Sequence, residues 1–253
     1  MLFSQRQLEI VEIARQEGRV LVEDLALRFS VTPQTIRKDL NDLCEARSLT
    51  RIHGGAIFPN GKENVDYEAR RSMAAYEKQA IGKAAAEIIP NKSSLFINIG
   101  TTTEAVGEAL LDHQELMIIT NNINVDNSLR VYPSFEVVIA GGVVRGSDGG
   151  IVGEAAVDFI RQFKVDYAVI GVSAIDKDGA LLDFDFREVK VAQAIIANAR
   201  HVILVSDSSK FERTAPVRIG HLSQVHTFIT DFCPEGSIRD VLAENGVRLV
   251  ETS

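Results

Sequence analysis

Residues 31–43 read VTPQTIRKDLNDL, and this stretch has the pattern of a short helix with one exposed, partly basic face. Thr32 is a suitable N-cap, and Pro33 fits the first helical position, where no backbone N–H is needed. At helical spacing the apolar residues form one face, which we expect to be buried: Ile36, Leu40 and Leu43. The opposite face carries amide, hydroxyl and basic groups: Gln34, Thr35, Arg37 and Lys38.

The segments on either side of this helix predict two more helices and a hairpin. Ser4 followed by Gln7 is a capping-box pattern for a first helix that ends at Gly18. A second short helix is indicated by apolar residues at i, i+3, i+4 and i+7: Val22, Leu25, Ala26 and Phe29. Residues 49–55 (LTRIHGG) predict a short strand that ends in a glycine turn. Together these elements describe a winged helix-turn-helix, which we assign to residues 1–57.

A winged helix-turn-helix predicts which side chains contact DNA. The recognition helix reads base edges with its N-terminal residues, and flanking basic groups hold phosphates. Amide, hydroxyl and guanidinium groups suit these contacts, and the wing tip reaches a phosphate or the minor groove. The predicted DNA-binding residues are Gln34, Thr35, Arg37, Lys38, Arg51 and His53. The alternative is a solvated helix face that carries two basic residues by chance, but the helix spacing and the glycine wing favour DNA.

The distribution of charge agrees with this placement. The chain has 253 residues and a net charge of −8. Residues 1–56 contain 8 basic and 8 acidic residues, so the remaining 19 basic and 27 acidic residues account for the whole excess of acid. Overall charge therefore gives no basic footprint, but the first 56 residues are free of net repulsion from a polyanion.

Cysteine usage and hydropathy predict a protein of the reducing cytoplasm. Cys44 and Cys233 lie far apart and lack metal-ligand spacing, so we expect two reduced thiols and no disulfide. The N-terminus carries acids and has no unbroken apolar run, unlike a signal peptide. No segment has the roughly 18 apolar residues of a membrane helix.

After residue 57 the pattern changes to that of an α/β fold. Residues 57–66 (IFPNGKENVD) predict a linker, and Tyr67 to Ile89 predict one long helix. Apolar runs of strand length then alternate with helical segments, which favours a Rossmann-like, mostly parallel sheet covered on both faces. These runs are Leu95–Ile99, Met117–Ile119, Val137–Ala140, Tyr167–Val172, Val202–Val205, Thr227–Ile229 and Val247–Val250. We assign residues 58–78 to the linker and the start of the connecting helix, and residues 79–253 to an effector domain.

Small and polar residues follow several of these strands. In open α/β sheets, ligands bind outside the carboxyl ends of the strands. Gly100 and the hydroxyl-bearing residues after it open a helix, which makes them a candidate phosphate cradle. Each loop alone is weak evidence, since glycine after a strand is often only a turn, but together they favour a ligand site. The residues concerned are Gly100, Thr101, Thr102, Thr103, Asn121, Asn122, Gly141 and Gly142.

Residues 205–211 (VSDSSKF) place a carboxylate and an ammonium group three positions apart after another strand. We expect Lys210 to hold an effector phosphate and Asp207 to accept a hydrogen bond from an effector hydroxyl. The alternative is a surface ion pair of little energetic weight. An acidic cluster precedes this segment, but it has no histidine, so we predict neither metal nor cofactor: Asp176, Asp178, Asp183, Asp185 and Glu188.

The chain resembles the DeoR family of bacterial repressors over essentially its whole length. The resemblance is carried by VTPQTIRKDLNDL, RIHGGA, IGTTTEAV, TNN, RGSDGGIVGEAA, GVSAIDKDGALLDFDFREV and SDSSKF. It implies a cytoplasmic, homo-oligomeric repressor that releases operator DNA when a phosphorylated metabolite binds. Glycerol 3-phosphate is the expected effector, and another sugar phosphate is the alternative. The resemblance also implies an effector domain similar in fold to ribose-5-phosphate isomerase, with residues 100–103 at the phosphate.

A departure from the isomerases argues against catalysis. They carry a lysine and a run of glycines before an Arg-Glu pair, whereas residues 181–186 here read LLDFDF ahead of Arg187 and Glu188. Glu188 could still serve as a general base, but it has no evident acid/base partner. We therefore expect a binding domain that includes Glu188, and not an enzyme. The rival from another class is a sugar-phosphate isomerase with an appended DNA-binding domain.

Overall fold

The protein forms two compact units, Met1–Ala75 and Tyr76–Ser253. The computed structural model describes residues 3–17, 19–46, 48–52, 54–58 and 67–252. The sequence-based boundaries at residues 57 and 78 stay predictions, and most of the predicted linker lies outside the described residues. In the described part of the chain, no helix combines the length and the apolar character that crossing a membrane requires.

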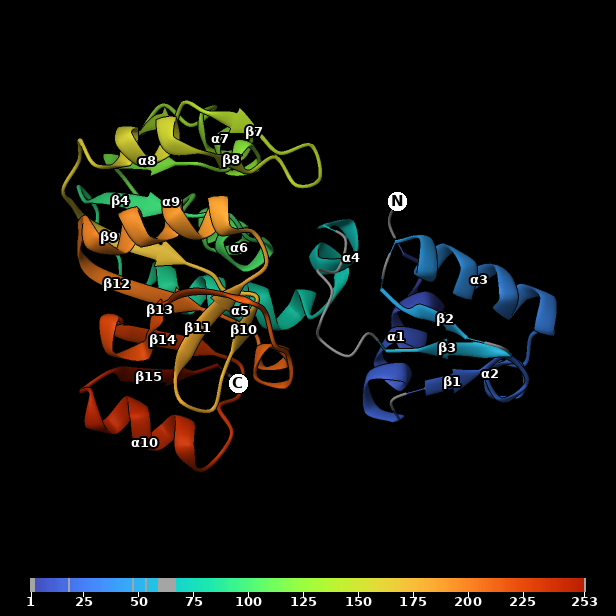
Figure 1. Ribbon diagram of the computed structural model, residues 1–253. Helices are drawn as coiled ribbons and strands as arrows, with labels where there is room; N and C mark the ends of the chain where they lie inside the picture. The colour runs from blue at the N-terminus through green and yellow to red at the C-terminus, as the bar shows by residue number, and fades with distance from the viewer. Residues whose placement is uncertain (1–2, 18, 47, 53, 59–66, 253) are drawn as a thin grey trace. The chain divides into compact units, whose positions relative to one another are not determined.

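The first unit contains a three-stranded antiparallel sheet in the order β1-β3-β2 and helices that pack against it (Figure 1). Its elements are α1 (Gln5–Glu17), β1 (Arg19–Leu21), α2 (Val22–Arg28), α3 (Pro33–Glu45), β2 (Thr50–Ile52), β3 (Gly55–Ile57) and α4 (Tyr67–Ser72).

The helix ends of this unit confirm the capping predictions. Ser4 N–H donates to Gln7 Oε1 at 2.9 Å, and Gln7 N–H donates to Ser4 Oγ at 3.2 Å, which is a capping box for α1. Thr32 Oγ1 accepts the N–H of Thr35 at 3.2 Å at the start of α3. The predicted inner face of α3 is fully buried: Ile36, Leu40 and Leu43. The predicted winged helix-turn-helix is therefore present.

The second unit is built on a seven-stranded sheet in which every neighbouring pair is parallel. All seven predicted strands belong to it, in the order β15-β14-β12-β9-β4-β5-β6. They are β4 (Ser94–Ile97), β5 (Leu116–Thr120), β6 (Phe135–Ile139), β9 (Val165–Ile170), β12 (Ala199–Val205), β14 (Thr227–Thr230) and β15 (Arg248–Glu251). The α/β, Rossmann-like prediction is confirmed.

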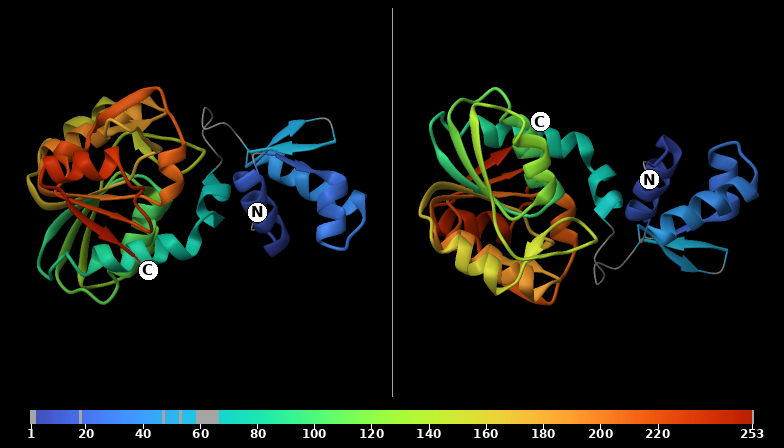
Figure 2. Two further views of the ribbon diagram at one scale, coloured as in Figure 1. Left: turned by 90° about the horizontal axis from the view of Figure 1, so that it is seen from below. Right: turned by 90° about the horizontal axis from the view of Figure 1, so that it is seen from above.

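Helices cover both faces of this sheet, as Figure 2 shows. One face carries α5 (Ala75–Ala86), α6 (Thr101–Ala109) and α7 (Ile123–Leu129), and the other carries α8 (Glu154–Ile160), α9 (Phe186–Ala197) and α10 (Ser237–Glu244). Successive side chains of a strand enter opposite apolar clusters: Leu95 and Ile97 pack on the α5/α6/α7 side, and Phe96 packs on the α8/α9/α10 side. Continuous apolar runs follow from this double coverage.

The strand order reverses between β4 and β9. From β4 the chain proceeds outward through β5 and β6, whereas from β9 it proceeds in the other direction through β12, β14 and β15. Figure 1 shows part of this stack, from β4 to β15. The crevice outside the carboxyl ends at such a reversal is where open α/β sheets bind ligands.

Two features differ from the sequence-based expectation. The single helix predicted from Tyr67 to Ile89 is wrong, because Ala74 adopts φ 51° between α4 and α5 and breaks the helix. Short antiparallel strands were also missed, because segments of two to five residues give little periodicity: β1, β7 (Val143–Val144), β8 (Ile151–Val152), β10 (Ala174–Ile175), β11 (Ala180–Asp183) and β13 (Val217–His221).

Candidate functional site

The outer face of α3 presents the predicted DNA-contacting groups to solvent. Gln34, Arg37 and Lys38 are exposed, and Thr35 is half-buried. Arg37 has only a loose ion pair, with its Nη2 3.7 Å from Glu23 Oε1. The inner face is fixed by Asp39, which is buried and accepts a hydrogen bond from Arg6 Nε at 2.7 Å. The inner face of α3 is thus held by the rest of the unit, and its outer face is exposed to solvent.

The wing is the hairpin of β2 and β3, paired as Thr50↔Ile57, Arg51↔Ala56 and Ile52↔Gly55. Arg51 is exposed on β2, and Gly54 turns the chain with φ 75°. His53, the other wing residue predicted to contact DNA, lies outside the described residues.

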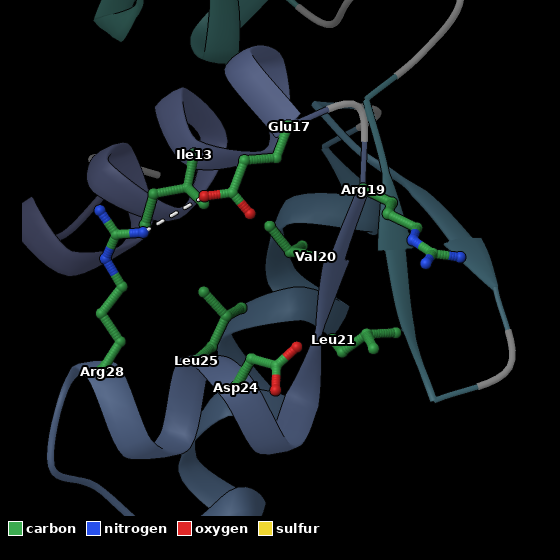
Figure 3. A pocket seen from close by; sticks show the side chains of 8 residues that line it. All are labelled: Ile13, Glu17, Arg19, Val20, Leu21, Asp24, Leu25 and Arg28. Atoms are coloured by element: carbon green, nitrogen blue, oxygen red, sulfur yellow. Dashed lines mark hydrogen bonds and ion pairs between the residues drawn. The ribbon is translucent and has the colours of Figure 1, made fainter.

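A separate pocket of roughly 260 Å³ lies among α1, β1 and α2 (Figure 3). Its walls include the acids Glu17 and Asp24 and the arginines Arg19 and Arg28. Arg28 Nη1 lies 3.4 Å from Glu17 Oε1, so the charges partly neutralise each other. None of the predicted site residues lines this pocket, and its mixed charge selects for neither an anion nor a cation.

In the second unit, the start of α6 lies at the reversal between β4 and β9. Gly100 is the N-cap, and Glu104 N–H makes the first helical hydrogen bond, to Gly100 O at 2.9 Å. The N–H groups of Thr101, Thr102 and Thr103 therefore have no partner within the helix, and they suit an anion. The Thr103 hydroxyl lies 2.7 Å from the backbone oxygens of both Asn98 and Gly100, so its side chain fixes the loop.

Asn122 connects this helix to its neighbour. Its Nδ2 donates to Glu104 Oε1 at 2.9 Å, and its Oδ1 accepts the N–H of Asn124 at the start of α7. Asn124 Nδ2 also donates to Glu104 Oε1, at 3.0 Å. The side chain of Asn122 is therefore occupied in holding α6 against α7.

The remaining predicted residues of this edge follow β5 and β6. Asn121 is fully buried and donates from Nδ2 to the backbone oxygen of Ile151 at 3.1 Å. Gly141 and Gly142 are exposed at the end of the edge strand β6. A side chain at Gly142 would meet Ile151 at 2.9 Å, so this glycine allows close packing on β8.

Asp207 and Lys210 follow β12, on the other side of the reversal. Both side chains are largely buried, and Lys210 Nζ lies 3.3 Å from Asp207 Oδ2. Asp207 Oδ1 accepts hydrogen bonds from the N–H and the hydroxyl of Ser209. Burial raises the pKa of Asp207, but the charges of Lys210 and Lys78 and the bonds from Ser209 outweigh it and hold the pKa well below its usual range. The carboxylate is thus ionised and already has partners, and its contact with an effector hydroxyl stays a prediction.

Lys78 is a candidate that the sequence analysis missed. It lies on α5, only 4% of its surface is exposed, and its charge acts on Asp207. Close packing of α5 on α6 brings it there, because a side chain at Gly82 would come within 2.5 Å of the backbone oxygen of Ala105. Lys78 and Lys210 therefore both act on Asp207 at the end of β12.

Several acidic side chains surround Arg145, which the sequence analysis also missed. Its guanidinium bonds to Asp148 at 2.8 Å and 2.6 Å, to Asp185 at 3.2 Å and to Glu188 at 2.6 Å. Asp183 is a fourth acid of this group, and it is buried and accepts a hydrogen bond from Ser173 Oγ at 3.1 Å. We call these side chains the Arg145 cluster: Arg145, Asp148, Asp183, Asp185 and Glu188.

Glu188 is the member of the Arg145 cluster whose pKa is raised. Burial and the charge of Asp183 raise its pKa to about 8, although Arg145 acts in the opposite direction. The pKa of Asp185 is instead lowered to about 2, by hydrogen bonds from Arg187 and Arg145 that outweigh its partial burial. Within the described residues, no His, Cys, Asp and Glu side chains group so as to hold a metal ion.

Comparison with known proteins agrees with the division into two units. Residues 6–62 match the DeoR-like helix-turn-helix domain, and residues 73–232 match the DeoR C terminal sensor domain. The chain belongs to the DeoR family. The family resemblance expected from the sequence is confirmed, and the second unit is a DeoR sensor domain.

Two DeoR relatives are similar to this chain over nearly their whole length. The glycerol-3-phosphate regulon repressor of Escherichia coli is 48% identical over 97% of this chain and 98% of its own. That of Haemophilus influenzae is 48% identical over 98% of this chain and 96% of its own. A solved structure, ribose 5 phosphate isomerase A from Neisseria gonorrhoeae, covers 53% of this chain and 52% of its own with 12% identity and a TM-score of 0.38.

The DeoR sensor domain brings some predicted residues together and leaves others apart. The carboxyl ends of β12, β9, β4 and β5 are consecutive, which places Asp207, Gly100 and Asn121 along one edge. Gly141 and Gly142 lie at the outer end of that edge, after β6. Lys78 and Arg145 had no local signal, because a single basic residue in a helix or a loop looks like ordinary surface. Only tertiary packing shows that Lys78 is buried and that Arg145 meets three acids.

Proposed function

We propose that this chain is a DNA-binding transcriptional repressor that leaves its operator when glycerol 3-phosphate binds the sensor domain. The single observation that carries the effector part is the charge pattern at the strand reversal. The start of α6, Lys78 and Lys210 supply donors and positive charge there. The relatives reported above are named for the glycerol-3-phosphate regulon, and this supports the choice of effector.

In this proposal, each predicted group has a stated task. The N–H groups of Thr101, Thr102 and Thr103 and the hydroxyls of the first two bind the phosphate, and the two lysines neutralise it. Asp207 holds Lys210 in place through the 3.3 Å ion pair. The glycine residues at 100, 141 and 142 shape the loops, and Glu188 contributes its carboxyl group from α9.

The DNA part of the proposal rests on the open face of α3. Gln34, Thr35, Arg37 and Lys38 contact the major groove, and Arg51 and His53 contact the backbone or the minor groove. Repressors of this type bind two half-sites, so we propose a homo-oligomer, either a dimer or a tetramer.

Catalysis is not part of the proposal. The place of the isomerases' lysine and glycine run is taken here by the buried strand β11 and by Asp185, which caps α9 through the N–H of Arg187 at 2.9 Å.

A release experiment tests this function. An operator is first selected from random DNA with the full-length protein, and the complex is then titrated with phosphorylated metabolites. Glycerol 3-phosphate is expected to release the DNA at concentrations at which a ketose phosphate and inorganic phosphate do not. Equal affinity for the DNA-bound and free forms would shift nothing, so binding and release are measured separately. Release by a ketose phosphate alone would support the alternative effector, and its isomerisation by the protein would support the enzyme.

A further inference from the structure

Two buried amide oxygens at the strand reversal lack a hydrogen-bond donor. Asn98 follows β4 and Asn121 follows β5, and their side chains are 1% and 0% exposed. The Oδ1 atom of each accepts no hydrogen bond from any described residue. Leaving a buried acceptor unsatisfied costs about 1–3 kcal/mol, so two such atoms side by side need an explanation.

The two amides lie on the same face of the sheet and next to each other. Ile97 pairs with Thr120 in the parallel register of β4 and β5, so Asn98 is level with Asn121 one residue further on. Phe96 and Ile119, two residues earlier on each strand, both belong to the apolar cluster on the α8/α9/α10 side. Because side chains alternate along a strand, we expect both amides to lie on that side of the sheet.

Hydrogen bonds hold the backbone of Asn98 and the amide of Asn121 in place. The backbone of Asn98 donates to Val169 O at 3.0 Å and accepts from the Thr103 hydroxyl, which fixes it between β9 and α6. The amide of Asn121 is held by its donation from Nδ2 to Ile151 O, and its backbone oxygen accepts the N–H of Ile151 at 2.7 Å. The orientation of the Asn121 amide follows from this bond, so its Oδ1 is the acceptor that is left over.

We propose that Asn98 and Asn121 recognise the hydroxyl groups of the effector. The ligand donates two hydrogen bonds to their side-chain oxygens. This inference rests on the proposed function, in which the phosphate binds at the start of α6. A phosphate dianion has only acceptors, so it cannot satisfy the two amides, whereas the hydroxyl groups of a polyol can. Asn98 precedes the N-cap Gly100 by two residues, or about 7 Å of extended chain, which suits the two ends of a small phosphorylated polyol.

This arrangement divides the task of recognition between the two ends of the ligand. The phosphate contributes affinity through charge, and the amide pair distinguishes a polyol from other phosphates, because a ligand without hydroxyls leaves both acceptors unpaired. Sites built to bind a hydroxyl reject analogues that lack it for this reason. A bound water molecule is the structural alternative, since it could satisfy both oxygens without any role in specificity.

A cycle of two ligands and four proteins tests the proposal. Calorimetry compares glycerol 3-phosphate with propyl phosphate, which has the same phosphate and no hydroxyl, on the parent, Asn98→Ala, Asn121→Ala and the exposed control Asn127→Ala. We expect the parent and the control to prefer glycerol 3-phosphate by on the order of a hundredfold. Each amide variant should bind glycerol 3-phosphate about tenfold more weakly and propyl phosphate unchanged.

The possible outcomes separate this inference from the proposed function. If the parent binds neither ligand, the proposed function fails and this inference fails with it. If the parent binds both ligands equally, or if the amide variants still prefer glycerol 3-phosphate as the parent does, only the inference is overturned. A bound water molecule then accounts for the two unsatisfied oxygens. Equal weakening of both ligands would indicate a distorted loop and would also overturn it. Urea unfolding of each variant identifies such a loss of structure independently.

Discussion

Arg145 Nη2 lies 2.6 Å from Glu188 Oε2, and the same guanidinium also binds Asp148 and Asp185. The Arg145 guanidinium is therefore shared among three acids, and Arg187 also binds Asp185. Burial and the charge of Asp183 raise the pKa of Glu188 to about 8, although Arg145 acts in the opposite direction.

This shared charge predicts a dependence of stability on pH. The folded protein keeps a proton on Glu188 up to about pH 8, whereas the unfolded chain loses it near the ordinary glutamate value of 4.5. Between these values the folded state binds more protons, so the free energy of unfolding falls as pH rises. Glu188→Gln keeps the shape and removes the titration, so its unfolding free energy should fall less steeply. Urea unfolding at several pH values between 5 and 8 measures the two slopes.

The exposed Glu154 provides the control for this comparison, because its pKa is lowered by a hydrogen bond and an ion pair with Lys190. Glu154→Gln should therefore have the slope of the parent over the same range. Identical slopes for the parent and Glu188→Gln would show that Glu188 is ionised and that Arg145 satisfies it.

DNA binding by α3 gives the second prediction. Arg37→Ala and Lys38→Ala should each weaken operator binding at least tenfold, because each removes an exposed charge from the face that enters the groove. A lost phosphate contact weakens all sequences alike and flattens the salt dependence, whereas a lost base contact relaxes specificity at one position by about 1–3 kcal/mol. Fluorescence anisotropy at several salt concentrations distinguishes the two.

The control is Arg161→Ala, on the sensor domain, which also removes one positive charge and should bind the operator like the parent. Unchanged affinity in both α3 variants would remove this helix from the interface.

The sequence was sufficient for the architecture because the signals that define it are local. The capping box of Ser4 and Gln7, the N-cap Thr32 and the seven apolar runs were each visible in a few neighbouring residues. Parallel strands buried on both faces leave uninterrupted apolar runs, which are hard to confuse with surface segments. The break at Ala74 was not predictable, because alanine favours helix and its left-handed conformation is imposed by tertiary structure.

The candidate site was predictable only where its residues follow a strand. Gly100 to Thr103, Asn121 and Asp207 were found because each comes directly after an apolar run. Lys78 was not, since it lies in a helix and does not follow a strand. The sequence also could not show what each side chain does. The hydroxyl of Thr103 and the amide of Asn122 look like effector-binding groups, but in the structure they form hydrogen bonds with Asn98, Gly100 and Glu104.

The different tasks of neighbouring threonines give the third prediction. Thr103→Val removes the hydroxyl that lies 2.7 Å from the backbone oxygens of Asn98 and Gly100, so it should lower the free energy of unfolding by about 1–3 kcal/mol. Thr103→Ser keeps the hydroxyl and should lose less. The double variant Thr101→Val and Thr102→Val should unfold like the parent, retain DNA binding and no longer respond to the effector. A normal response of the double variant would place the phosphate elsewhere.

The last prediction concerns the two lysines that share Asp207. Lys210 Nζ lies 3.3 Å from Asp207 Oδ2, and the charge of the buried Lys78 also lowers the pKa of this carboxyl. We expect the ammonium groups of both lysines to bind the effector phosphate. Lys210→Ala and Lys78→Met should therefore each weaken glycerol 3-phosphate binding by tenfold or more and retain operator binding, which gives a repressor that the effector cannot release.

Asp207→Asn should act differently, because it leaves both ammonium groups in place and removes the charge that competes with the phosphate. Its affinity for inorganic phosphate should rise or stay constant, while its unfolding free energy falls as the lysines repel each other. Lys164→Ala, at an exposed site on the same domain, is the matched control for calorimetry. Parent-like affinity in both lysine variants would leave the Asp207–Lys210 pair with a structural task only.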